Sequence, residues 1–276
     1  MLNTLKVWCE YVFRKQTFSE LVFDYGVKRQ TLQGKFDEIV LPDKQHNPRE
    51  LNLTVDATFW NNDGVVVFRD QEGQEDLWWE FVDTEKKETY LKGRTELECM
   101  GYTFRSVTGD GLPGLPFVFN GIPFQLCHWH FKHMIIRRTT LNPQTKAGKD
   151  LLHHANHLQT YTREVLKQHI HEWHMKHEHL LKEKTVHPSG KSSYTHKSLR
   201  SAYGSFRRHL QHLYTYQDYP ELNIPRTTSS AEGHFSHVKV RVGAHRGISK
   251  ERRRQLLSTI FLRGTTKYHP DHWKSL

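Results

Sequence analysis

Three acidic residues occupy positions where a chain could hold divalent metal ions. Asp56 ends the apolar run Leu-Asn-Leu-Thr-Val-Asp, and Asp110 follows Ser-Val-Thr-Gly and precedes a glycine. Glu232 lies in Thr-Ser-Ser-Ala-Glu-Gly-His, at the start of an expected helix. Carboxylate oxygens are the ligands that Mg²⁺ prefers, and three converging carboxylates can hold two such ions for phosphoryl chemistry.

Each of these acids also has an ordinary structural interpretation. A carboxylate at the end of a strand is most often a turn or cap residue. Ser229 and Glu232 have the S-x-x-E spacing of a capping box, in which the glutamate serves only to start a helix. On spacing alone, the cap is the better interpretation of Glu232.

The segment Cys127-His128-Trp129-His130 offers one Cys-x-x-His pair. A structural zinc needs four ligands, and Cys9 and Cys99 have no close ligand partners in the sequence. Three widely spaced cysteines also make a disulfide framework unlikely and favour a reducing compartment. The residues alone therefore give Cys127 and His130 no defined role.

These residues require a mixed α/β domain to position them. Short apolar runs rich in valine predict strands at 51–59, 64–70, 77–82, 102–108 and 123–127, with a helix at 84–100 between the third and fourth. Apolar residues at a period near 3.6 predict that 148–215 is mostly helical. A last pair of helices is expected at about 230–240 and 250–262. Strands followed by helices indicate a mixed sheet.

The first forty residues have helix-turn-helix spacing. One helix is expected over Phe18 to Tyr25, a turn at Gly26, and a second helix from Lys28 to about Ile39. In such a unit the second helix enters the major groove of DNA, and its early exposed side chains meet bases and phosphates. Those side chains are Lys28, Arg29, Gln30, Gln33 and Lys35. The alternative is an ordinary helical hairpin packed on the main domain. Residues 41–50, polar with two prolines, are expected to form a linker.

The formal charge of +10 is unevenly divided along the 276 residues. Residues 1–100 hold 13 Lys and Arg against 19 Asp and Glu, whereas residues 101–276 hold 27 against 11. So basic a second half favours a polyanionic partner, most often nucleic acid, over an anionic membrane. The longest uncharged stretch, Gly111 to His128, contains three prolines and predicts no membrane-spanning helix. No secretory signal is expected at the start of the chain either.

Taken together, the residues resemble the DDE transposases of bacterial insertion sequences related to the Mutator group. The resembling segments are Leu-Thr-Val-Asp-Ala-Thr-Phe at 53–59, Ser-Val-Thr-Gly-Asp-Gly-Leu-Pro-Gly-Leu at 106–115, Cys-His-Trp-His at 127–130 and Thr-Ser-Ser-Ala-Glu-Gly-His-Phe-Ser-His-Val-Lys at 228–239, continued by His245-Arg246-Gly247 and Arg252-Arg253. No single motif is specific, but four in this order are. The helix-turn-helix is also in the style of the family, whereas the Cys-rich N-terminal region of many full-length relatives is missing.

The resemblance implies an RNase H-like catalytic domain over 51–264, with a helical insertion at about 131–226 before the last catalytic helix. It places a helix-turn-helix at 1–40 ahead of this domain and a tail at 265–276 behind it. It implies that Asp56, Asp110 and Glu232 are catalytic and bind two Mg²⁺ or Mn²⁺ ions. Cys127 and His130 would then belong to a supporting C/D-x-x-H signature.

The function that the resemblance implies is metal-dependent DNA cleavage and strand transfer at terminal inverted repeats. The partners would be the repeat DNA, the target DNA and further copies of the chain, in the bacterial cytoplasm and without a membrane. Two rivals stay open at this point. One is a catalytically inactive or domesticated DNA-binding protein derived from a transposase, and the other is an RNase H-like nuclease without strand transfer.

Overall fold

The computed structural model describes residues 2–263, with Ser230 and Arg263 described by their backbone alone. The predicted tail, 265–276, lies outside the described residues. The chain divides into two compact units, one made of Met1–Thr103 with Ser229–Leu276 and the other of Phe104–Thr228. Both ends of the chain thus belong to the first unit, and a continuous middle segment makes the second.

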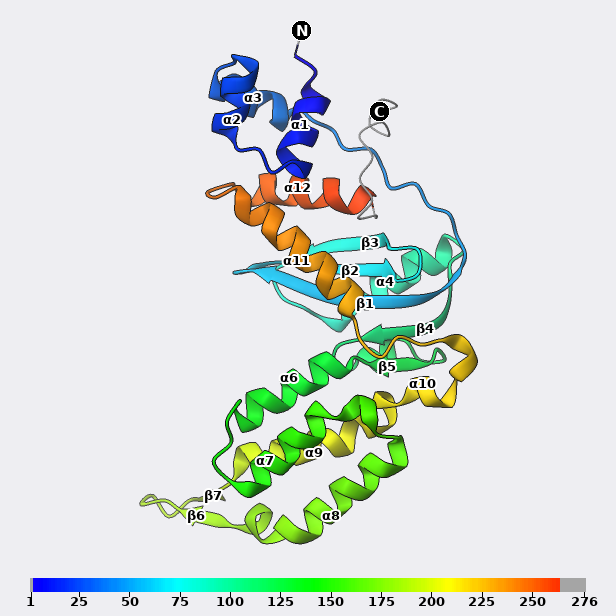
Figure 1. The fold of residues 1–276 in the computed structure, drawn as a ribbon, viewed down its shortest axis with the longest axis vertical. Helices are drawn as coiled ribbons and strands as arrows, with labels where there is room; N and C mark the ends of the chain where they lie inside the picture. The colour runs from blue at the N-terminus through cyan, green and yellow to red at the C-terminus, as the bar shows by residue number, and fades with distance from the viewer. Residues whose placement is uncertain (1, 264–276) are drawn as a thin grey trace. The chain divides into compact units, whose positions relative to one another are not determined.

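The first unit combines helices from both ends of the chain with three strands. Its elements are α1 (Thr4–Phe13), α2 (Phe18–Tyr25), α3 (Arg29–Asp37), β1 (Glu50–Trp60), β2 (Asp63–Asp70), β3 (Glu75–Val82), α4 (Lys87–Cys99), α11 (Ser229–Ala244) and α12 (Lys250–Arg263). The predicted strands of this unit, the two helices expected at 18–25 and 28–39 and the final two helices are confirmed to within a few residues at each end. Figure 1 shows α12 alongside the N-terminal helices and α11 crossing strands β1 to β3.

The strands form one mixed sheet in the order β3-β2-β1-β4-β5, where β4 is Thr103–Gly109 and β5 is Phe124–Leu126. Strands β1, β2 and β3 are antiparallel neighbours, whereas β4 and β5 run parallel. The predicted mixed α/β class is therefore confirmed.

Strand β2 is buried over its whole length because helices cover both of its faces. Val65 and Val67 point into a core shared with α11 and α12. Phe68 points to the opposite face, where its ring meets Trp78 of β3 at 5.1 Å and Tyr90 of α4 at 6.0 Å. Successive side chains of a strand alternate between faces, so the valine run supplies two cores at once.

The N-terminal helices are packed into this unit and do not stand apart from it. Trp8 of α1 and Phe36 of α3 are fully buried in the same core as Leu256 and Phe261 of α12. The indole N–H of Trp8 also donates to Thr259 Oγ1 at 3.1 Å. Helices predicted as a separate DNA-binding unit are therefore part of the main core.

The predicted linker is also fastened to the first unit. Arg49 donates to Asp70 at 2.6 Å and to Glu75 at 2.8 Å, and Lys44 pairs with the same Glu75. Up to Glu50 the segment has no regular secondary structure, as its prolines predict.

A buried polar group joins β2, β3 and α11 within the first unit. Asp76 is fully buried and accepts a bond from the guanidinium of Arg69 at 2.6 Å, and only 3% of the Arg69 side chain is exposed. The Nε2 atom of His234 lies 2.8 Å from the other carboxylate oxygen of Asp76, although not in hydrogen-bonding geometry. A buried charge pair of this kind makes each partner depend on the other.

The second unit is mainly helical beyond the strands β4 and β5. Its further elements are α5 (Leu115–Val118), α6 (His128–Thr139), α7 (Lys146–Asn156), α8 (Arg163–Lys182), the hairpin β6 (Lys184–Val186) and β7 (Ser192–Tyr194), α9 (Lys197–Leu213) and α10 (Thr215–Asp218). Helices α6 to α9 pack on one another, and α9 and α10 pack on β5. The expected helical stretch at 148–215 is confirmed, but the helical region begins earlier, at His128. Among the described residues no helix is long and apolar enough to cross a membrane.

The buried pair of Arg69 and Asp76 gives the first prediction. Asp76→Asn removes the negative charge and leaves the guanidinium of Arg69 buried without it, which we expect to lower the free energy of unfolding by about 3–5 kcal/mol. The matched control is Asp218→Asn, because Asp218 pairs with Arg163 at the surface with 43% of its side chain exposed, and such pairs contribute about 1 kcal/mol or less. Urea denaturation measures both variants. Equal small losses would show that the pair does not anchor the sheet.

Candidate functional site

Asp56 lies within the first strand and not at its end. It occupies β1 opposite Val67 of β2, and only 6% of the residue is exposed. Its Oδ1 accepts a bond from the backbone N–H of Ala57 at 2.8 Å. A carboxylate buried to this degree is uncommon in protein interiors and often marks a polar or ionic site.

Glu232 lies in the first turn of α11, where it is half-buried. Helix α11 packs on β1, the strand of Asp56, within the first unit. The helix begins at Ser229, so that serine is already part of it, whereas the capping box expects Ser229 just outside. Helix ends are defined to within one or two residues, so both interpretations of Glu232 agree with its position.

Asp110 follows directly after β4 in the second unit. The parallel pairing of Gly109 with Leu126 brings the carboxyl ends of β4 and β5 side by side, and the N–H of Cys127 donates to the carbonyl of Gly109 at 2.8 Å. The carboxylate of Asp110 accepts a bond from the N–H of Leu112 at 2.9 Å, which closes a tight turn. Two of the sequence motifs therefore meet at one edge of this strand pair.

The segment before α11 joins the same cluster through Thr228. Its N–H and its hydroxyl lie 3.3 and 3.4 Å from the Sγ atom of Cys127, and the hydroxyl oxygen is 3.5 Å from Nδ1 of His130. Further back in this segment, the carbonyl of Pro225 accepts from the hydroxyl of Thr108 of β4 at 2.9 Å. The fourth motif is thus tied to the second and third within the second unit.

His130 lies in the first turn of α6, and electrostatic interaction links it to Asp110. Burial lowers the pKa of His130, and the negative charge of Asp110 opposes that shift. A thiol and an imidazole suit a transition metal better than Mg²⁺, which prefers oxygen ligands. The sulfur of Cys127 already accepts hydrogen bonds from Thr228, as a supporting residue would.

His128, between these two residues, has a structural role that the sequence did not reveal. Its ring lies in the protein interior, and its Nε2 atom is 2.6 Å from the carbonyl of Leu213, so Nε2 carries the proton and donates. Burial lowers its pKa to about 4. By contrast, Trp129 is 43% exposed, with its ring 3.9 Å from that of His133. The apolar periodicity of this segment is too weak to predict α6, so the sequence does not show that His128 is buried and Trp129 exposed.

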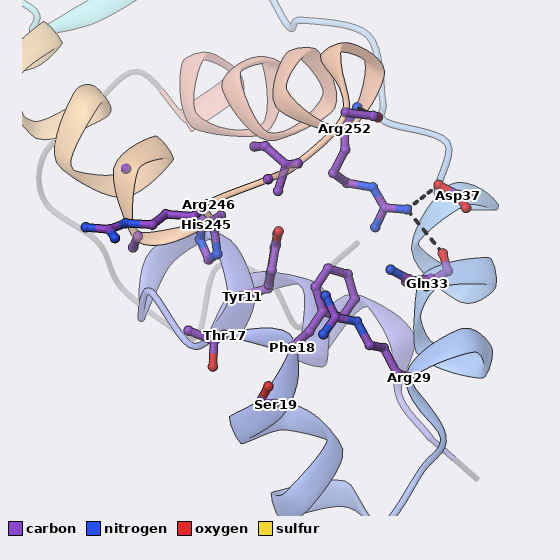
Figure 2. A pocket seen from close by; sticks show the side chains of 15 residues that line it. Tyr11, Thr17, Phe18, Ser19, Arg29, Gln33, Asp37, His245, Arg246 and Arg252 are labelled. Atoms are coloured by element: carbon purple, nitrogen blue, oxygen red, sulfur yellow. Dashed lines mark hydrogen bonds and ion pairs between the residues drawn. The ribbon is translucent and has the colours of Figure 1, made fainter.

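The five predicted DNA-binding residues are distributed along α3, from its N-cap to Lys35 in its last turn. Lys28 is the N-cap of this helix, Gly26 before it adopts a left-handed φ of 61°, and Lys28, Arg29 and Gln30 are exposed while Gln33 and Lys35 are half-buried. Arg29 and Gln33 line a pocket that the loop between α11 and α12 also borders (Figure 2). Not all of the expected reading face is therefore directed outward.

The structure thus distributes the predicted site residues over both units. Asp110, Cys127 and His130 come together in the second unit, where Thr228 completes their cluster. Asp56 and Glu232 belong to the first unit, on elements that pack against each other. The sequence predicts no role for Thr228, which belongs to the fourth motif, because its contacts with Cys127 and His130 form only in the folded chain.

The buried ring of His128 gives a prediction about acid stability. Its pKa is about 4 in the folded protein against an ordinary value of 6.5, so the unfolded chain binds the proton first and stability falls as the pH drops from 6.5 toward 4. Between pH 7.5 and pH 5 this residue should cost about 2 kcal/mol of unfolding free energy. His128→Gln keeps a donor for Leu213 but does not titrate, so its acid loss should be smaller by that amount. Urea unfolding at both pH values measures the difference, and equal losses would contradict the assignment.

No protein-family model matches the chain, and no curated protein matches it significantly. What the chain does must therefore be inferred from its own residues and contacts.

Proposed function

We propose that this protein is a DDE transposase that binds the terminal inverted repeats of its element, cleaves DNA at the element ends and joins those ends to target DNA. Asp56, Asp110 and Glu232 are its catalytic carboxylates in this proposal. The fold belongs to the RNase H-like group, with α6 to α10 forming the insertion before α11. The protein would act next to DNA in the bacterial cytoplasm.

The observation that carries the proposal is the meeting of separate motifs in the second unit. Asp110 follows Gly109, whose carbonyl accepts a hydrogen bond from the N–H of Cys127. The sulfur of Cys127 accepts a hydrogen bond from Thr228 at the entry to α11. These residues belong to three of the four segments that resemble the family, and they are more than a hundred positions apart at the extremes. Segments that resembled the family by chance would have no reason to meet.

The order of the elements supports the same assignment. Asp56 is on the first strand, Asp110 directly follows the fourth, and Glu232 opens the first helix after the insertion. This is the layout that the resemblance implies. The position of Asp56 also argues against a role as a turn or cap residue, because it is buried within β1.

The carboxylates suit divalent metal ions by their chemistry. Oxygen donors are what Mg²⁺ and Mn²⁺ take, and all three residues supply them. When bound, two such ions would activate the attacking oxygen and stabilise the leaving oxygen of an in-line phosphoryl displacement. Water would attack a phosphodiester at each end and release a 3′-hydroxyl. That hydroxyl would then form a bond to a phosphorus of the target strand and displace the 3′-oxygen of the target, which leaves as a hydroxyl. Cys127, His130 and Thr228 would hold the strand end and the helix entry in place.

The basic residues would bind the DNA backbone. Twenty-seven Lys and Arg lie in residues 101–276, a part of the chain that includes all the helices of the second unit. The exposed residues at the start of α3 would contact the bases and phosphates of the DNA. Bringing two ends together requires a dimer or a larger assembly of this chain.

Loss of the carboxylates is the direct test of catalysis. Asp56→Asn, Asp110→Asn and Glu232→Gln should each lower Mg²⁺-dependent cleavage by more than about 100-fold, because each variant replaces an ionised metal ligand with a neutral amide. Asp43→Asn is the matched control, since Asp43 is an exposed residue of the segment before β1. The substrate is a plasmid carrying the DNA that flanks the coding sequence.

Three outcomes separate the proposal from its rivals. Full activity in all three variants would refute the assignment of the carboxylates. A wild-type protein that binds the DNA but never cleaves it is a DNA-binding derivative, and one that cleaves without joining is a nuclease.

Lys28 gives a prediction about DNA binding that does not depend on catalysis. Lys28→Gln removes an exposed positive charge at the start of α3. We expect weaker DNA binding and a log Kd against log salt slope that is smaller by about 0.9, the value for one phosphate contact. Fluorescence anisotropy with labelled duplexes at several salt concentrations measures both. An unchanged slope would remove Lys28 from the DNA contacts.

A further inference from the structure

The first unit contains a pocket that the proposed catalysis does not use. It has a volume of about 790 Å³ and is lined by α1, α2, α3 and the segment from the end of α11 to the start of α12. Figure 2 shows side chains from all of these elements directed toward it. Pockets of this size hold small organic ligands.

Three arginines give the pocket a positive charge. Arg29 comes from the start of α3, Arg246 from the loop after α11, and Arg252 from the first turns of α12. Asp37 is the one carboxylate among the lining residues, and it pairs with Arg252. Burial lowers the pKa of the neighbouring His245, which therefore adds no charge at neutral pH. The excess of arginine over carboxylate favours an anion.

Arg252 has a donor in the pocket that no described residue satisfies. Its side chain is only 9% exposed, and its Nη2 atom donates to the carbonyl of Gln33 at 3.2 Å and to Asp37. The Nη1 atom of the same guanidinium is buried and has no hydrogen-bond partner within residues 2–263. Buried donors are nearly always satisfied in folded proteins, so a missing acceptor is the simplest explanation.

Tyr11 presents a second donor of this kind. The residue is 1% exposed, and its hydroxyl has no hydrogen-bond partner among the described residues. Its ring lies between His245, 3.9 Å away by ring centroids, and Phe18 at 5.0 Å (Figure 2). Burial raises the pKa of Tyr11 to about 12 although Arg252 and Arg29 oppose the shift. The hydroxyl therefore stays protonated and can donate.

We propose that this pocket binds a phosphate group carried by a nucleotide. Two unsatisfied donors and three guanidinium groups match the several charged oxygens of a phosphate, which arginine can bind through two parallel bonds. The volume exceeds what a phosphate alone needs, and the partly exposed ring of Phe18 offers a surface against which a base can stack. The nucleotide is either free or part of a DNA strand, and both sources present the same chemistry.

The test is calorimetric titration of the full-length protein with defined ligands. Deoxyadenosine monophosphate, inorganic phosphate, deoxyadenosine, citrate and a single-stranded ten-nucleotide oligonucleotide are compared. We expect the monophosphate to bind at least tenfold more tightly than the nucleoside and more tightly than citrate. If the oligonucleotide binds more tightly than the monophosphate, the source of the phosphate is a DNA strand. If the monophosphate binds at least as tightly as the oligonucleotide, the source is a free nucleotide.

Two variants and a matched control connect this binding to the pocket. Tyr11→Phe removes only the unpartnered hydroxyl, so it should weaken binding about tenfold while raising the thermal midpoint of the ligand-free protein. Arg246→Gln changes an exposed residue, keeps the fold intact and should also weaken binding about tenfold. Arg14→Gln removes an exposed charge outside the pocket and should leave the affinity unchanged within twofold. The proposal is overturned if neither the monophosphate nor phosphate binds at millimolar concentration, or if citrate binds as tightly as the monophosphate. It is also overturned if both variants bind the monophosphate with the affinity of the wild type.

Discussion

The hydrogen bonds between Thr228 and Cys127 are the contacts on which the proposed site depends most. Cys127 follows β5, and its backbone N–H binds the residue that precedes Asp110. Thr228 immediately precedes α11, the helix of Glu232. Cys127, at the start of α6, therefore binds the end of β4 through its backbone N–H and the entry to α11 through its sulfur. In the proposed function, Cys127 would support the site through these hydrogen bonds.

A second buried group fixes α11 within the first unit. His234 follows Glu232 by two positions and approaches Asp76, whose other oxygen is bound by Arg69. The helix therefore lies against β3 close to the residue for which we propose a catalytic role. Charged pairs buried in this way contribute little net stability, but removing one partner is costly, which restricts the ways in which the helix can move. The same unit includes the nucleotide pocket, so α11 and its following loop would serve two functions.

Much of the fold follows from the sequence because its strands and helices have strong patterns. The valine run of β2 and the turn at Gly26 predict elements that the structure confirms. Helix α6 was missed because its sequence, His-Trp-His-Phe-Lys-His-Met-Ile-Ile-Arg-Arg-Thr, is rich in polar residues and has little apolar periodicity. The partners of Thr228 and the inward position of Gln33 depend on segments far away in the chain, which local spacing does not reveal. For Glu232, the spacing favours a helix cap, and its place in the first turn of a helix packed against β1 agrees with both interpretations.

The central claim is that this protein joins DNA ends as well as binding them. The most direct measurement is a strand-transfer assay in which a duplex with a pre-cut 3′-hydroxyl end, taken from the border of the element, is incubated with supercoiled target plasmid and Mg²⁺. We expect joined products that require both the metal and the 3′-hydroxyl, and a 3′-deoxy end should give none. If the protein binds both DNAs under these conditions and yields no joined product with either Mg²⁺ or Mn²⁺, the claim is contradicted.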